Sequence, residues 1–240
     1  AASPTQYGST VAIGNVVVSP SEFMPRLFAE NGRLLDSQGR ITLDTPEALR
    51  ALENYRETYS YSDRTIYDFW KNALEGFADG TAAMTVVFIN YASHILNSQM
   101  SRIAGKLGFA PVPGGKPLLG GGVIGIAQSC TCPAAACKFL EWLYADLVAP
   151  VFTMLGGLSP CRSAYSNRDI SEQYPWLSTA RKSFPTAQRR SNSTYYQNFS
   201  ELQLETILAA HVQQAVLGVC SPEEALKQAQ EDCNRYFQPW

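Results

Sequence analysis

The chain has 240 residues, of which 45% are hydrophobic, and its 19 basic and 21 acidic side chains give a net charge of −2 at pH 7. This length and apolar content can bury one large core or two smaller ones. The nearly balanced charge, without a run of Lys or Arg, argues against a nucleic-acid surface, and no apolar run reaches the roughly 18–20 residues that a membrane span needs. The first residues, AASPTQYG, match neither a signal peptide nor a lipidation site.

The N-terminal part of the chain alternates strand and helix signals. A stretch rich in Val and Gly predicts a strand from Tyr7 to Val18. The sequence SPSE at 19–22 has the chemistry of a helix start, and Asn31-Gly32 should end that helix. The segment 33–43, RLLDSQGRITL, predicts a hairpin, because Ser-Gln-Gly supplies a turn between two β-tending runs.

The later elements carry clear end signals. Thr45 can cap a helix that has Pro46 in its first turn, and the sequence SPEE at 221–224 is a capping box. Gly80 should end a helix over about 66–78 and lead into a buried strand at 82–89. The remaining expected elements are a helix at 90–102, strands at 107–112 and 123–127, and helices at 134–145, 198–217 and 221–237.

Two loops are rich in glycine and proline. One spans residues 111–122 and ends in three consecutive glycines, and the other is GGLSP at 156–160. Such composition is typical of a tight connection, or of a loop where backbone must come close to another group.

The cysteines do not indicate a metal centre. The chain has six, and we expect most of them to be free, buried thiols: Cys130, Cys132, Cys137, Cys161, Cys220 and Cys233. An even count permits disulfides in an oxidising compartment, but a domain of this size does not need them. The run CTCPAAAC lacks the usual zinc spacing and has no nearby histidine, so we predict no metal and no cofactor.

The order of these elements resembles that of family 1 extracellular solute-binding proteins, the carbohydrate-type binding proteins of ABC importers. The motifs, in chain order, are a helix ending ENG, a hairpin, TPEAL, FxxGxxAM, GFAPVPGG, GGGVIGI, AxxFLEWL, GGLSP and SPEEAL. The resemblance covers nearly the whole chain, from about Tyr7 to Phe237, and corresponds to the C-terminal two-thirds of such a protein.

The resemblance implies a helix-rich α/β fold of the periplasmic-binding-protein-like type II class. In that fold two lobes joined by crossing strands hold a ligand in a cleft. Residues 1–110 and 163–240 would form the C-terminal lobe, and residues 111–162 would supply a crossing strand and a returning segment of the N-terminal lobe. Most of the N-terminal lobe would then be absent from this chain, which would be one piece of a larger protein.

The resemblance also implies ligand-binding residues on cleft loops. A sugar site needs aromatic faces and a few planar polar groups. Many relatives place a tryptophan after the AAM strand, where this chain offers Asn90 and Tyr91. The other candidates are the helix start with Ser19, Ser21 and Glu22, the glycine loops with Gly121, Gly122, Gly157 and Ser159, and the segment before the last long helices with Arg189 and Tyr195.

Each of these candidates also has a structural interpretation. Phe88, beside Asn90, continues an apolar strand and is expected in the core. Arg189 and Arg190 can be a solvated surface pair, and at most one of Tyr195 and Tyr196 should face a cleft. An acidic residue such as Glu22 is favoured at any helix start by the helix dipole.

An enzyme is disfavoured. Only His94 and His211 could serve as a base near neutral pH, and both fall in predicted helices. The sequence contains neither a nucleophile elbow nor a phosphate-binding loop. We therefore predict no catalytic residue.

Two functions remain open. The first is an extracellular, membrane-anchored lipoprotein that captures a small polar ligand, a sugar or oligosaccharide, for an ABC transporter permease by lobe closure. The second is a cytoplasmic ligand-sensing domain of a transcription regulator built on the same fold, which reduced cysteines would suit.

Overall fold

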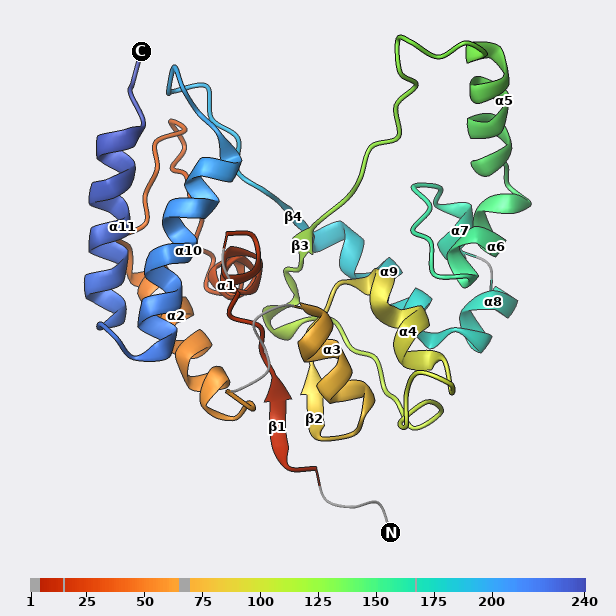
Figure 1. Ribbon diagram of the computed structural model, residues 1–240, viewed down its shortest axis with the longest axis horizontal. Helices are drawn as coiled ribbons and strands as arrows, with labels where there is room; N and C mark the ends of the chain where they lie inside the picture. Colours follow the sequence, from red (N-terminus) through yellow and green to blue (C-terminus); the bar gives the residue numbers. More distant parts are fainter. Residues whose placement is uncertain (1–4, 15, 65–69, 167) are drawn as a thin grey trace. The chain divides into compact units, whose positions relative to one another are not determined.

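The chain folds into two compact units, each assembled from separate stretches of sequence (Figure 1). The computed structural model describes residues 5–14, 16–64, 70–166 and 168–240. Unit 1 comprises Ala1–Val87, Val112–Leu119 and Thr186–Trp240, and unit 2 comprises Phe88–Pro111 and Gly120–Pro185. These boundaries differ from those expected at 110 and 162. Which unit corresponds to which lobe of the relatives stays a prediction.

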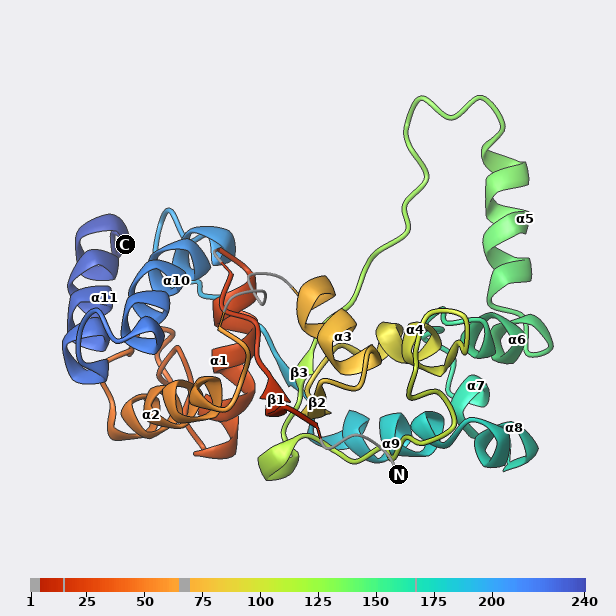
Figure 2. The same ribbon diagram turned by 60° about the horizontal axis from the view of Figure 1, so that its bottom comes forward.

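The core of unit 1 is built from four helices: α1 (Val18–Ala29), α2 (Pro46–Ser60), α10 (Glu201–Leu217) and α11 (Pro222–Tyr236). Figures 1 and 2 show α10 and α11 side by side in both views. Phe23, Leu52, Leu204 and Leu226 are fully buried at their junction. Each such side chain contributes roughly 1.5–3 kcal/mol through the apolar area it removes from water.

The predicted starts of α2 and α11 are confirmed. Thr45 Oγ1 accepts the Ala48 N–H at 3.2 Å, and Ser221 Oγ accepts the Glu224 N–H at 3.1 Å. Gly218 ends α10 in the left-handed conformation with φ of 79°, where a residue without Cβ is favoured. Local capping interactions therefore determine where these helices begin or end.

The start of α1 corrects the prediction for residues 7–22. The strand β1 covers only Tyr7–Thr10, and α1 already begins at Val18. The Ser19 N–H donates to the Gly14 carbonyl at 3.1 Å, and the Ser21 N–H donates to the Val17 carbonyl at 3.2 Å. These two N–H groups are therefore already paired within the chain and are not free to bind a ligand.

Unit 1 also contains two short parallel strand pairs. β1 pairs with β2 (Ala82–Thr85), and β3 (Leu118–Leu119) pairs with β4 (Gln188–Arg189). Helix α3 (Trp70–Ala78) packs on the first pair, and Gly80, two residues beyond its end, has a φ of 80° that confirms the predicted glycine cap. The preceding residues 65–69 lie outside the described residues.

The strand after Gly80 is shorter and more exposed than predicted. It ends at Thr85 instead of residue 89, and the Met84 side chain is 65% exposed. The hairpin at 33–43 is confirmed, with a bridge between Leu35 and Ile41 and a turn in which Gly39 has a φ of 79°.

Unit 2 is helical in its described residues and has a smaller core. Its helices are α4 (Ala92–Leu96), α5 (Pro133–Leu143), α6 (Val148–Met154), α7 (Ser163–Ser166), α8 (Arg168–Gln173) and α9 (Pro175–Ser183). Short 3-10 turns lie at η1 (Ile89–Tyr91) in this unit, at η2 (Pro113–Gly115) in unit 1 and at η3 (Phe184–Thr186). The core gathers small and aromatic side chains, including Ala149, Ala164, Tyr165 and Trp176.

Two strand predictions and one helix prediction need correction. Residues 107–112 and 123–127 are irregular, and Val123 is fully exposed. A strand requires a neighbour for its backbone N–H and C=O groups, and no described strand runs beside either segment. The helix predicted at 90–102 is limited to η1 and α4.

All six cysteines lie in the described residues and are free thiols, as expected, but most of them are not buried. Only Cys233 is buried, and its burial raises the pKa of the thiol to about 12. Cys132 and Cys137 are exposed, which corrects the expectation for the cysteine-rich run. Among the described residues, no helix is both long and apolar enough to cross a membrane.

Candidate functional site

In unit 1, two of the sequence candidates, Ser21 and Glu22 on α1, belong to a polar cluster in which each side chain contacts a guanidinium group. Arg190 donates to Ser21 Oγ at 3.0 Å and forms an ion pair with Glu205, which is only 3% exposed. One residue beyond Ser21, Glu22 pairs with Arg26 at 2.9 Å. The segment carrying Arg189 and Arg190 is thereby fixed against α1 and α10.

Burial governs the electrostatics of this cluster. It raises the pKa of the Glu22 carboxyl, and the Arg26 charge opposes that shift. Burial also lowers the pKa of Arg190 and raises that of Glu201, while the attraction between these two groups opposes both shifts. Because a buried charge is costly unless it is paired, the two guanidinium groups mainly compensate carboxylates of the same unit.

A polar groove of about 930 Å³ lies next to this cluster within unit 1. The groove is formed by the end of α1, by the hairpin and by the segment 187–192. Its polar side chains are Asn31, Arg33, Asp36, Ser37, Thr42, Thr45, Glu47, Gln188, Arg189, Arg190, Ser191 and Asn192. Amides, hydroxyls and guanidinium groups at this density can hydrogen-bond a hydroxyl-rich ligand.

Of the other unit 1 candidates, Ser19 and Tyr195 occupy contrasting surroundings. Ser19 is fully buried, and its hydroxyl donates to backbone carbonyls, including that of Ile13 at 3.1 Å. Tyr195 is partly exposed and meets the Tyr196 ring edge-on with centroids 5.0 Å apart. The Tyr196 hydroxyl accepts the Ile41 N–H at 2.9 Å, so Tyr196 is the structural member of the pair.

In unit 2, the two glycine loops approach the short segment that carries Asn90 and Tyr91. A Cβ on Gly120 would lie 3.4 Å from the Phe88 ring, which places the start of the glycine run beside η1. A side chain on Gly156 would overlap Ser93, so the GGLSP loop reaches the other end of that segment. The structure therefore brings both glycine loops to the residues around Asn90 and Tyr91.

The individual side chains of these loops differ in availability. Asn90 is exposed and Tyr91 is half-buried, whereas Ser159 is buried. The Ser159 hydroxyl accepts the Cys161 N–H at 3.2 Å, and its carbonyl accepts the Tyr165 hydroxyl at 2.9 Å. Ser159 thus holds the loop in shape.

The four candidate glycines and serines of these loops do not have one common role. Gly121 and Gly122 have no atom within 4 Å of a built Cβ. A side chain at Gly157 would overlap the Phe152 ring, so this glycine is required for packing. The ligand-binding roles of all eleven candidates remain predictions.

Glu205, like Arg26, is a residue of the cluster that sequence reasoning missed. It lies on the buried side of α10, next to Leu204 and one turn before Ala209. A charged residue among buried positions of a helix signals a partner elsewhere in the fold. That signal could have been detected, but it could not identify Arg190 as the partner.

Two observations bear on the possibility of catalytic or metal chemistry. His211 lies on α10, and its Nε2 is 2.8 Å from Asp232 of α11, so it links two helices. In the described part of the chain, no group of three or more His, Cys, Asp or Glu residues could hold a metal ion.

The fold and the loop arrangement define a periplasmic-binding-protein-like chain. The chain belongs to the bacterial extracellular solute-binding protein family, whose model matches residues 5–179. The resemblance and the fold class expected from the sequence are thereby confirmed.

Solved structures with the same fold include three solute-binding proteins. Maltose-bound MalE3 of T. maritima has a TM-score of 0.80 at 22% identity, over 95% of this chain and 60% of that one. A ribitol complex of a solute-binding protein from Agrobacterium radiobacter K84 has a TM-score of 0.75 at 22% identity. The match covers 97% of this chain and 60% of that one. A solute-binding protein from Thermotoga lettingae TMO, bound to alpha-D-tagatose, has a TM-score of 0.73 at 26% identity. The match covers 95% of this chain and 59% of that one.

The chain thus spans about 60% of the length of the structures that it matches. Neither the family match nor these structures supports the transcription-regulator alternative.

Proposed function

We propose that the protein captures a small hydroxyl-rich ligand, a sugar or sugar alcohol, for an ABC importer. The observation that carries this proposal is the membership of the solute-binding family. It is supported by the ligands bound in similar structures, which are maltose, ribitol and alpha-D-tagatose.

The candidate residues give the proposal a chemical basis. In unit 1, the groove beside Arg189 offers amides, hydroxyls and guanidinium groups. In unit 2, Tyr91 offers an aromatic face next to two glycine loops. Planar polar groups and one aromatic face are the combination that recognises a sugar ring.

The proposed mechanism is capture by lobe closure, without catalysis. Closure is favoured when the ligand makes contacts in the closed state that the open state lacks. The protein would act outside the cytoplasmic membrane, anchored there as a lipoprotein, and would deliver its ligand to the permease. This proposal includes the expectation that most of the N-terminal lobe belongs to a larger protein of which this chain is one piece.

Thermal unfolding in the presence of ligands tests the function. The complete gene product is heated with maltose, ribitol or D-tagatose, and with sodium sulfate as a control for general solute effects. A ligand at 100 times its dissociation constant should add about 2.7 kcal/mol of stability. The 240-residue chain is measured in parallel and should respond less, because it spans only part of its relatives. A series of sugars and sugar alcohols that leaves the complete protein unchanged would contradict the proposed ligand class.

A further inference from the structure

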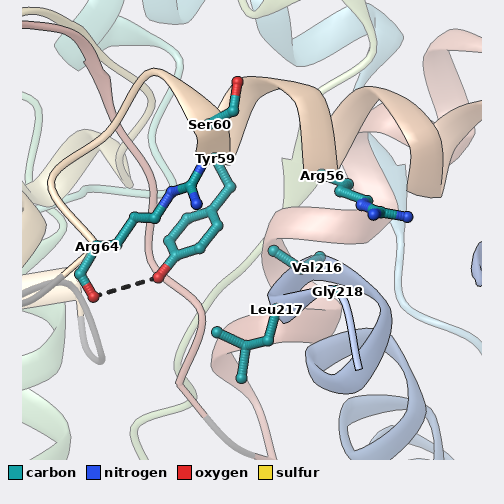
Figure 3. A pocket seen from close by; sticks show the side chains of 7 residues that line it. All are labelled: Arg56, Tyr59, Ser60, Arg64, Val216, Leu217 and Gly218. Atoms are coloured by element: carbon teal, nitrogen blue, oxygen red, sulfur yellow. Dashed lines mark hydrogen bonds between the residues drawn. The ribbon is translucent and has the colours of Figure 1, made fainter. Parts of the chain in front are cut away.

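A small pocket opens in unit 1 where α2 and α10 end, and the proposed solute site does not use it (Figure 3). Its volume is about 290 Å³. The lining residues are Arg56, Tyr59, Ser60, Arg64, Val216, Leu217 and Gly218. None of them is acidic, so two cations share one cavity without a carboxylate in its wall.

The two guanidinium groups have no anionic partner in the described structure. Neither Arg56 nor Arg64 forms an ion pair with any described residue. The Arg64 guanidinium lies 5.8 Å from the centre of the Tyr59 ring, and the Tyr59 hydroxyl donates to the Arg64 carbonyl at 3.3 Å. Arg64 is therefore held by an aromatic ring while its N–H donors stay available.

Arg56 is positioned by the left-handed cap of α10. A Cβ built on Gly218 would lie 3.7 Å from Arg56 Nη2, which places the guanidinium over this glycine. Figure 3 shows Arg64 beside the Tyr59 ring and Arg56 near Gly218 and Val216. The two cations thus flank an aromatic and aliphatic floor.

Exposed apolar side chains occur in the pocket wall and at the residues that follow it in the sequence. Tyr61 follows Ser60 and is 58% exposed, Leu217 is 51% exposed, and Val219 follows Gly218 and is 72% exposed. Tyr and Arg are enriched in the centres of protein interfaces, where exposed apolar groups are covered on binding. This composition is typical of a protein-binding surface.

Two simpler explanations account for less of the geometry. Cations near helix C-termini are favoured by the helix dipole, but lysine would serve equally there and no apolar rim would be needed. A free small anion would leave Tyr61, Leu217 and Val219 in water. The volume is also at the lower limit of ligand pockets, which hold about 300–1,000 Å³, so it suits side chains of a partner better than a whole ligand.

We propose that this pocket docks an acidic segment of a partner protein, with carboxylates facing Arg56 and Arg64 and apolar side chains covering Leu217 and its neighbours. Arginine forms paired hydrogen bonds with carboxylate oxygens, which fixes the segment in one orientation. The docking does not depend on the identity of the transported solute.

A random dodecapeptide library displayed on phage tests the proposal without a known partner. Peptides are selected on the complete gene product and counter-selected on the double variant Arg56→Ala/Arg64→Ala. We expect the peptides that bind only the parent protein to be enriched in Asp or Glu beside Leu or aromatic residues. Changing their acids to amides should weaken binding by about tenfold or more, because the charged hydrogen bonds are lost.

Matched variants separate docking from general charge effects. Arg181→Ala/Lys182→Ala removes two exposed cations from α9 and should leave peptide binding unchanged. Arg56→Lys/Arg64→Lys should keep the melting temperature but weaken peptide binding, because lysine lacks the planar fork. Far-UV circular dichroism establishes that each variant is folded.

Several results would overturn the docking site. These are a selected set without acidic enrichment, no peptide that distinguishes parent from variant, or equal loss of binding in the α9 control. Full peptide binding by the lysine variant would indicate that only charge at the helix ends matters. Competition by N-acetylglutamate at the concentration of the peptides would indicate a free-anion site. None of these results bears on sugar binding, which the thermal measurements test separately.

Discussion

The two units differ in how deeply they bury the residues that their sequences mark as apolar. In unit 1, helices α1, α2, α10 and α11 enclose Leu, Phe and Tyr side chains completely. In unit 2, helix α5 buries only Leu143, while Phe139 and Trp142 on the same helix are more than half exposed. The apolar pattern of a helix therefore identifies the helix in both units, but it predicts burial only where neighbouring elements of the same unit cover it.

The largest expected effect concerns the charged interior of unit 1. Glu205→Ala leaves Arg190 without its buried partner, and breaking a buried pair costs about 3–5 kcal/mol. Urea unfolding of the variant should show a loss in that range. Glu223→Ala on α11, at an exposed position, is the matched control and should change little. A loss below about 1 kcal/mol in Glu205→Ala would mean that the pair is solvated.

A second pair of variants compares the two cores directly. Leu52→Ala removes a side chain that is fully buried in unit 1 and should cost about 2–5 kcal/mol. Phe139→Ala truncates a larger side chain that is 55% exposed in unit 2 and should cost about 0.5 kcal/mol or less. Both changes are followed by chemical unfolding of the 240-residue chain. Equal losses would show that unit 2 buries α5 as deeply as unit 1 buries α2.

The success of the sequence prediction depends on whether the structural signal is local. The starts of α2 and α11 were predicted because Thr45 and Ser221 bind N–H groups three residues away, which is a local interaction. The strands at 107–112 and 123–127 were wrong because a strand depends on a distant neighbour that an apolar run does not reveal. Apolar patterns there gave no information on the pairing partner.

The site was predictable in its segments and less so in its contacts. Sequence reasoning selected the starts of α1 and of the 187–192 segment, and the structure joins them through Ser21 and Arg190. It did not foresee that Glu205 would neutralise Arg190. Such pairs join residues far apart in the chain, so their spacing carries no periodic signal.

The last comparison concerns the contributions of the two units to ligand binding. Tyr91→Ala in the complete gene product should weaken sugar or sugar-alcohol binding by about 1–3 kcal/mol, the range for a lost aromatic contact. Arg189→Ala, in the groove of unit 1, should weaken it by about 1–2 kcal/mol, because one charged hydrogen-bond donor is removed. Calorimetric titration measures both, with Tyr61→Ala as the control, since Tyr61 is an exposed aromatic residue that is not one of the sugar-site candidates. An unchanged affinity in Tyr91→Ala would remove this residue from the binding site.

Hydrogen exchange with and without bound sugar tests most directly the claim that both units take part in capture. With the ligand identified by thermal unfolding, the account predicts slower amide exchange at 88–93 and 156–159 in unit 2 and at 187–192 in unit 1, all in the same sample. Protection confined to one unit, or centred on the pocket of Arg56 and Arg64, would contradict it.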